Sequence, residues 1–259
     1  MTGAEPFGFT SLAAALALVA VALLLSWWQR LDVERDIGLA FVRAFVQLMA
    51  VDYIIHLILQ TDRPLYVALT LAAMLLFAVI TSARRARGLP GAWTLAAASI
   101  GVASMATLAV MLVLGIIPAG ARYVIPIGGM LIGNCMNVAS VTAVRLLEDA
   151  ADRRPQIEAS LALGASPRQS TATLARRSVR LAMVPVIDST KTTGLVFLPG
   201  AMTGMILAGA EPLQAVRLQA VVMFMLLAAV ALTASIMSYL APGRLFTPQQ
   251  QLRRLRGRA

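Results

Sequence analysis

Long apolar runs recur along the whole chain, and they constrain its fold more than any other feature. Of the 259 residues, 59% are hydrophobic and 13% are charged, whereas a soluble domain is typically about 25% charged. An apolar run of 18 or more residues is long enough to cross a bilayer as a helix. We therefore predict an all-α, polytopic integral membrane protein, with a single transmembrane domain over residues 1–259 and about seven transmembrane helices. The expected spanning segments are Thr10–Trp28, Ile37–Leu59, Leu65–Ser82, Ala92–Ile117, Tyr123–Leu147, Gly194–Gly209 and Leu218–Leu240.

The arginines gather in alternate loops between these runs, and this bias predicts the orientation. Cytoplasmic loops of membrane proteins carry an excess of Lys and Arg. With the N-terminus outside, only Arg63, Arg122 and Arg217 fall in outer loops, and the tail 241–259 is basic and cytoplasmic. We expect a multi-pass protein of the cytoplasmic (inner) membrane, N-terminus outside and C-terminus inside. The bias also explains the net charge of +10, so we expect no nucleic-acid partner.

One hydrophilic stretch, residues 148–180, interrupts the apolar pattern on the side predicted to be cytoplasmic. Within it, "IEASLALG" places Ile157, Leu161 and Gly164 on one face of a helix. Gly164 is suited to end that helix, and Ser166–Pro167 to start the next, with proline at the first helical position. The stretch is too short for a domain. It predicts a short helix, a tight glycine turn and a second helix that leads back to the membrane.

The segment "EASLALGAS" resembles the "EAA" loop with which permeases of ATP-binding cassette (ABC) importers contact their ATPases. The resemblance implies a coupling helix formed by Glu158, Ala159, Leu161, Gly164, Ala165 and Ser166. Glu158 would contact the ATPase; alternatively, it only stabilises its own helix through the helix dipole. The chain departs from the importer pattern at Pro185, which lies 21 residues after Gly164 rather than about a dozen.

Further motifs are similar to those of the FetB-type permease family, over roughly residues 120–240. They are "GNCMN" (133–137), "EASLALGASPRQ" (158–169), "KTTGLVFLPGAMTGMILAG" (191–209) and "EPLQAVRLQAVVMFMLLAA" (211–229). That family includes bacterial iron-export permeases and plant relatives linked to aluminium tolerance, which work with a separate ATP-binding subunit. The resemblance implies a non-catalytic permease subunit of an ABC exporter for iron, or for another metal or small solute. It would act as a homodimer in the lipid bilayer.

The chain itself lacks the motif with which a P-loop binds ATP. A P-loop needs G-x-x-x-x-G-K-[ST] to hold the phosphates, yet the only lysine, Lys191, follows Thr190 and no glycine precedes it closely. We therefore expect no cofactor bound by this chain, with ATP on the partner subunit. Two other functions stay open, a gradient-driven secondary transporter or channel and ABC export of a nucleotide sugar. With one histidine, one cysteine and no G-x-S-x-G motif, an intramembrane enzyme is disfavoured.

Polar residues inside a membrane are costly and indicate candidate sites. In "GNCMN", Asn134 and Asn137 share a helix face, and Cys135 and Met136 add sulfur atoms. They are expected to line the translocation path; alternatively, they serve helix packing or dimer contact beside Gly129 and Gly133. Cys135 and Met136 are also weak candidates for metal ligands, as are Asp52 and His56 of the second segment.

The sixth segment, Gly194–Gly209, is short and contains a proline and several glycines. It is expected to be either a broken helix beside the cargo or a tightly packed crossing. Its candidate path residues are Pro199, Gly200, Met202 and Gly204. Just before it, Asp188 and Lys191 are spaced for an ion pair at the cytoplasmic mouth, where they would form a gate or an ordinary interfacial pair.

Overall fold

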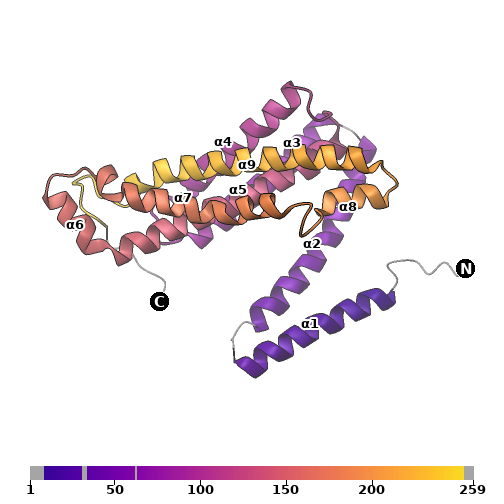
Figure 1. Cartoon of the computed structure of the whole chain (residues 1–259), viewed down its shortest axis with the longest axis horizontal. Coiled ribbons are helices and arrows are strands. Elements are labelled where there is room, and N and C mark those ends of the chain that lie inside the picture. The colour runs from indigo at the N-terminus through magenta and orange to yellow at the C-terminus, as the bar shows by residue number, and fades with distance from the viewer. Residues whose placement is uncertain (1–8, 31–33, 62, 254–259) are drawn as a thin grey trace, which may run out of the picture. The chain divides into compact units, whose positions relative to one another are not determined.

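The computed structural model describes residues 9–30, 34–61 and 63–253, with the backbone alone for residues 9–13, 15, 22, 36 and 50–61. Every regular element in these ranges is a helix, as predicted (Figure 1). The helices are α1 (Phe9–Gln29), α2 (Glu34–Thr61), α3 (Pro64–Arg85), α4 (Ala92–Val113), α5 (Ala121–Asp152), α6 (Arg154–Ala162), α7 (Pro167–Thr192), α8 (Gly200–Leu207) and α9 (Pro212–Arg244).

The contacts between helices divide the chain into two units, residues 1–61 and 62–259. In the first unit, α1 contacts α2, and Ser26 Oγ donates a hydrogen bond of 2.7 Å to Glu34 Oε1. The second unit holds the other helices and both candidate sites described below. That the two units act as one permease domain stays a prediction.

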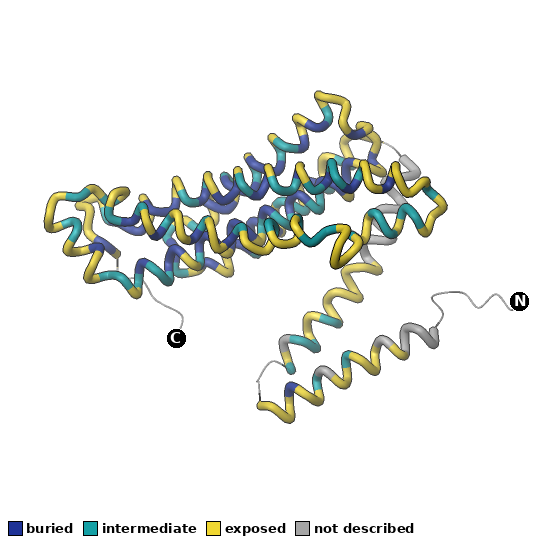
Figure 2. The backbone as a smooth tube through the Cα atoms, viewed as in Figure 1, coloured by how far each residue is buried: buried dark blue, intermediate teal, exposed yellow. Residues whose placement is uncertain are grey.

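The second unit is a bundle built around α5, which contacts α3, α4, α7 and α9. Its core contains Ile100 of α4, Leu131 and Leu146 of α5, and Met237 of α9, all with at most 1% of their surface exposed. Burial runs as a stripe along the inward face of each long helix (Figure 2). The opposite faces carry many exposed leucine, valine and phenylalanine side chains, as expected of helices that face lipid.

Hydroxyl groups in the core bond to their own helices, which is how helices satisfy polar groups away from water. Ser104 Oγ donates to the Ile100 carbonyl at 2.6 Å, and Thr233 Oγ1 donates to the Ala229 carbonyl at 2.8 Å. Four of the described helices, α3, α4, α5 and α9, are long and apolar enough to cross a bilayer. The polytopic, all-helical prediction is confirmed at this level, and the count of seven stays a prediction.

The expected sixth spanning helix, Gly194–Gly209, is wrong. Only α8 is helical there, and its eight residues extend about 12 Å, far short of a bilayer core of about 30 Å. Gly194 at φ +82° and Gly209 at φ +87° turn the backbone at the two ends of the segment. Pro199 precedes the helix as its N-cap, so the chain before it is not helical.

The second helix predicted after the glycine turn is confirmed as α7, and it continues without a break past Arg180 to Thr192. It has 26 residues, about 39 Å, and lies antiparallel to α9. Arg168 at its start stacks on Tyr239 near the end of α9, 4.5 Å from the ring centroid. Its four arginines, Arg168, Arg176, Arg177 and Arg180, kept this helix from being recognised as a bundle member. In its second half, Ala182 is buried and packs with Val138 and Val230, whereas most of the neighbouring side chains are partly or fully exposed.

The ion pair of Asp188 and Lys191 forms as predicted, with Asp188 Oδ1 3.9 Å from Lys191 Nζ. Its position at the cytoplasmic mouth stays a prediction. Because α7 is continuous, the pair lies at the end of the bundle near α8, opposite to α6 (Figure 1). Both side chains are more than 60% exposed.

Candidate functional site

The helix-turn-helix at one end of the bundle is fixed by complete capping interactions. Helix α6 ends at Ala162, and Gly164 adopts φ +90°. The Gly164 amide donates to the Leu161 carbonyl and the Ala165 amide to the Ser160 carbonyl, each at 3.0 Å. This is the Schellman pattern, whose left-handed position favours glycine because it has no Cβ. The predicted glycine turn is confirmed.

The start of α7 is equally well defined. Pro167 occupies the first helical turn, and Ser166 is the N-cap. The Gln169 amide donates to Ser166 Oγ at 3.3 Å, and the Ser166 amide donates to Gln169 Oε1 at 2.8 Å. This reciprocal capping box satisfies backbone donors that would otherwise lack partners. The two helices therefore meet at a turn whose geometry is set by local hydrogen bonds alone.

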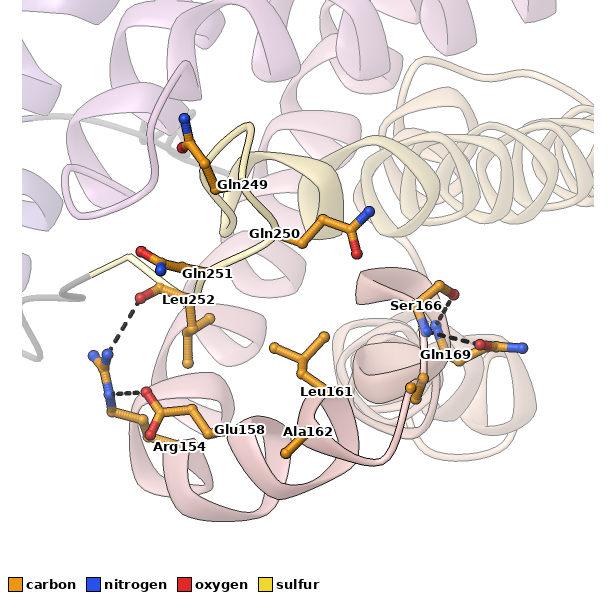
Figure 3. A pocket seen from close by; sticks show the side chains of 12 residues that line it. Arg154, Glu158, Leu161, Ala162, Ser166, Gln169, Gln249, Gln250, Gln251 and Leu252 are labelled. Carbon is orange, nitrogen blue, oxygen red and sulfur yellow. Dashed lines mark hydrogen bonds and ion pairs between the residues drawn. The ribbon is translucent and has the colours of Figure 1, made fainter.

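A C-terminal segment, residues 245–253, packs against α6 and was not anticipated. Leu245, Phe246 and Leu252 are buried. The Arg154 guanidinium donates to the carbonyls of Leu252 and Arg253, each at 3.2 Å, and its Nε lies 2.8 Å from Glu158 Oε1 (Figure 3). Arg154 thus connects the short helix to the tail.

Between α6, the glycine turn and the tail lies an open cleft of about 740 Å³. Five of the six predicted coupling residues line it, and Figure 3 shows several of them around the opening. They are Glu158, Leu161, Gly164, Ala165 and Ser166. Ala159 is exposed on α6 but does not line the cleft. On the other wall stand Gln249, Gln250 and Gln251, for which the sequence offered no signal beyond a polar run.

Three predicted path residues meet at the other end of the bundle. Asn134 of α5, Pro199 and Gly200 line a cavity of about 330 Å³ between α5, α7, α8 and α9. Gln219 of α9 also lines it, although its sequence surroundings resemble an ordinary apolar helix. Gln219 is 8% exposed, and its Oε1 has no hydrogen-bond partner in the part of the chain that the structure describes.

The other path candidates do not reach this cavity. Cys135 is fully buried in the core, and Met136 packs against that core. Asn137 is exposed and accepts a hydrogen bond of 3.1 Å from Arg85 of α3, so the two asparagines serve different neighbours. The remaining candidates that do not line the cavity are Asp188, Lys191, Met202 and Gly204.

The packing alternatives for the glycines can also be compared with the structure. A Cβ at Gly128 would meet Leu71, and one at Gly129 would touch Met74, so α5 approaches α3 closely there. By contrast, a Cβ added at Gly133, Gly200 or Gly204 would meet no atom within 4 Å in the described part of this chain. The predicted tight crossing at Gly200 and Gly204 is therefore not formed within the chain.

No cluster of three or more His, Cys, Asp or Glu side chains occurs in the described part of the chain. Of the four weak metal candidates, Asp52 and His56 lie outside the residues whose side chains are described. Cys135 is buried in the apolar core, and Met136 packs against it. The donor set that the structure describes thus offers no anionic cage for a bare metal ion.

Comparison with known proteins extends the resemblance noted in the motifs. A sequence profile of an uncharacterised protein family, UPF0014, matches residues 9–246. The rice (Oryza sativa subsp. japonica) UPF0014 membrane protein STAR2 is 42% identical over 239 residues, covering 92% of this chain and 84% of the relative. The Arabidopsis thaliana protein ALUMINUM SENSITIVE 3 is 38% identical, covering 95% and 90%.

A bacterial relative carries a transport name. The probable iron export permease protein FetB of Escherichia coli (strain K12) is 37% identical over 242 residues, covering 93% of each chain. No solved structure matches. The similarity extends through the N-terminal third of the chain, where the sequence motifs gave no resemblance.

Proposed function

Because this chain belongs to the UPF0014 family of membrane permeases, we propose that it is the membrane-spanning subunit of an ABC exporter. A separate cytoplasmic ATPase would supply the energy, since the sequence has no P-loop. The observation that carries the proposal is the helix-turn-helix of α6 and α7, which projects from one end of the bundle with both of its inner helix ends capped. A rigid lever of this kind can transmit the movement of a docked partner.

The docking surface in this proposal consists of the cleft and its two walls. Glu158 is already paired with Arg154, so its carboxylate is half-exposed and partly neutralised before any partner binds. Leu163, at the tip of the turn, is 89% exposed and is the apolar group available for burial in an ATPase groove. We assign Leu163 the packing contact and the Arg154–Glu158 pair the polar contact.

The membrane topology follows if α7 replaces the incorrect sixth span. Crossings by α1, α2, α3, α4, α5, α7 and α9 make seven, and α6 then lies at the cytoplasmic end with the tail. Three of the four arginines of α7 fall in its first half, toward that end, where lipid headgroups would stabilise them, and Arg180 lies at its middle. The N-terminus is outside, as the loop charges indicate, and α8 lies toward the outer side. For a bacterial cell this would be the inner membrane.

Iron is the proposed cargo, on the strength of the name of the Escherichia coli relative. Two copies of the chain would form the pathway. The open space around Gly133 and Gly204 within the described chain supports this arrangement, because small residues let a second helix approach closely. Export of a nucleotide sugar and gradient-driven transport are the competing functions.

Association with the ATPase tests the proposal first. The chain and an ATP-binding subunit from the same genome are co-expressed, one is affinity-tagged, and ATPase activity is measured on the isolated complex. Co-isolation with stimulated hydrolysis, reduced by Leu163→Ser, is the expected result. Leu207→Ser, an equally exposed leucine at the opposite end of the bundle (79%), is the matched control. No association with any ATP-binding subunit of that genome would exclude the ABC function.

A further inference from the structure

The turn between α3 and α4 forms an open pocket with three arginines around it. Arg84 and Arg87 line this pocket of about 340 Å³, together with Gly91 and Trp93. Arg244, in the last turn of α9, reaches the same place, because a Cβ on Gly91 would lie 3.5 Å from its guanidinium carbon. These five residues form what we call the arginine pocket. It brings together guanidinium groups from two ends of the sequence.

The three guanidinium groups of the arginine pocket are not neutralised by the chain itself. Among the described residues, Arg84, Arg87 and Arg244 form no ion pair and donate no side-chain hydrogen bond. The neighbouring Arg85, by contrast, donates to Asn137 at 3.1 Å. The helix dipole favours basic residues at the ends of α3 and α9, but it does not require them to surround one pocket, where like charges repel. A bound anion would remove that repulsion.

The composition of the pocket favours a phosphate group at a membrane surface as the anion. An arginine can donate two parallel hydrogen bonds to phosphate oxygens. The walls also include Ala83 and Leu89, which are apolar and buried. Trp93 lines the pocket and is half-exposed. Tryptophan is enriched where membrane meets water, with its ring at the level of the lipid headgroups.

An exposed apolar strip leads away from the pocket along α3, which is long and apolar enough to cross a bilayer. Leu76 and Phe77 precede Arg84 by eight and seven residues, so the three share one helix face. The two apolar side chains are 54% and 66% exposed. Seven residues rise about 10 Å along a helix, which separates a headgroup at Arg84 from an acyl chain at Phe77. A soluble phosphate would make no use of this strip.

We propose that the arginine pocket binds the phosphate of an anionic phospholipid, with an acyl chain along Leu76 and Phe77. Basic pockets between helices on the cytoplasmic side of a membrane bind anionic headgroups, and the proposed topology places the ends of α3 and α9 on that side. A zwitterionic lipid fits less well, because its ammonium group is repelled by the arginines. This inference goes beyond the proposed function, since the binding needs neither an ATPase nor a cargo.

Tryptophan fluorescence detects this lipid. The chain has three tryptophans, so Trp27→Phe with Trp28→Phe leaves Trp93 as the only one. This full-length chain in detergent is titrated with phosphatidylglycerol whose acyl chains carry bromine, which quenches a tryptophan that it contacts. Phosphatidylcholine with the same brominated chains is the zwitterionic reference. We expect saturable quenching by phosphatidylglycerol, at a concentration tenfold or more below that needed for phosphatidylcholine.

Charge-removing variants in the same background locate the headgroup. Arg84→Gln with Arg87→Gln should weaken phosphatidylglycerol binding roughly tenfold or more, because two arginines that attract the anionic headgroup are lost. Arg176→Gln with Arg180→Gln is the matched control. It removes the same charge from two exposed arginines of α7 that do not line the pocket. The control should leave the affinity within twofold.

Three results would overturn the inference: equal quenching by the two lipids, no loss of affinity in the Arg84 and Arg87 variant, or an equal loss in the α7 control. The third would show that surface charge alone attracts the lipid. Inorganic phosphate that displaces phosphatidylglycerol at equal concentration and constant ionic strength would assign the pocket to a soluble phosphate instead. The measurement contains no ATPase, so failure of the proposed function would leave its result unchanged.

Discussion

The two ends of the α3–α9 bundle differ in how their segments are held. At the α6 end, the Schellman turn, the capping box and the contacts of Arg154 bond the turn and the tail to the helices. At the α8 end, helix α8 buries none of its side chains, and Gln219 Oε1 has no hydrogen-bond partner within the described chain. The α6 end also keeps one buried oxygen without a hydrogen bond in the described chain, Asp149 Oδ2 in the last turn of α5, which lies 4.0 Å from Arg177 Nε.

We relate this difference to two functions, transmission of movement at the α6 end and solute binding at the α8 end. A lever must keep its shape while a partner pushes it, so its hydrogen bonds are local and closed. A transport site must bind and then release, which unsatisfied neutral groups allow. A substitution at one end should therefore leave the other end intact as an internal reference.

The largest effect is expected from Gly164→Val. A β-branched residue at φ +90° is strained by at least about 1–2 kcal/mol, so the turn should shift or open. ATP-driven transport should fall tenfold or more, measured in liposomes with the ATPase present. Gly243→Ala, at a helical glycine with open space around it, is the control. Normal transport by the valine variant would refute the lever.

Arg154→Met should have the next largest effect. It keeps the aliphatic stem but removes the donors to the carbonyls of Leu252 and Arg253 and frees Glu158. We expect a three- to tenfold weaker affinity for the ATPase, with faster amide hydrogen exchange at Arg253, whose amide donates to the Leu245 carbonyl. Arg145→Met breaks a similar exposed pair with Glu148 away from the tail and is the control. Equal exchange in the two variants would show that the tail does not depend on Arg154.

Gly128→Ala and Gly133→Ala form a pair with opposite expected signs. The first places a methyl group against buried Leu71, so unfolding should become easier by about 1 kcal/mol. The second faces open space within the chain and replaces a flexible helical residue, a change worth roughly 0.5–1 kcal/mol of added stability. Thermal unfolding in detergent compares them. If Gly133→Ala instead disrupts a homodimer, size-exclusion chromatography would reveal the loss.

Asp188→Asn should have the smallest effect. The pair with Lys191 is long and exposed on both sides, so it contributes about 0.5 kcal/mol or less. Transport and stability should stay near wild type, within twofold. A large loss of transport in this variant would restore the gate that the sequence suggested for this pair.

A feature could be predicted from the sequence where the residues that determine it are neighbours in the chain. The glycine turn and the start of α7 were predictable, because Gly164, Ser166 and Pro167 carry their conformational preferences themselves. The cleft wall at Gln249–Gln251 was not, because it arises from a contact between segments about 90 residues apart. The sixth span was misplaced because apolar content was weighed above helix continuity. Pro199 breaks the apolar segment, whereas α7 accommodates both its arginines and Pro185.

The candidate cavity shows the same limit. Asn134 was identified because a polar residue stands out in an apolar run, and Gln219 carries the same signal two residues after Arg217. Only packing against α5 and α7 places it beside Asn134, and that packing is set by the antiparallel course of α7.

The central claim is that ATP hydrolysis on a partner drives cargo through this chain by way of the α6–α7 turn. The most direct measurement is iron(II) movement across liposomes that contain the chain, with and without its ATP-binding subunit, for wild type and Gly164→Val. The account predicts movement only with wild type, the partner and ATP together. Movement by the chain alone, or undiminished movement with the valine variant, would contradict it.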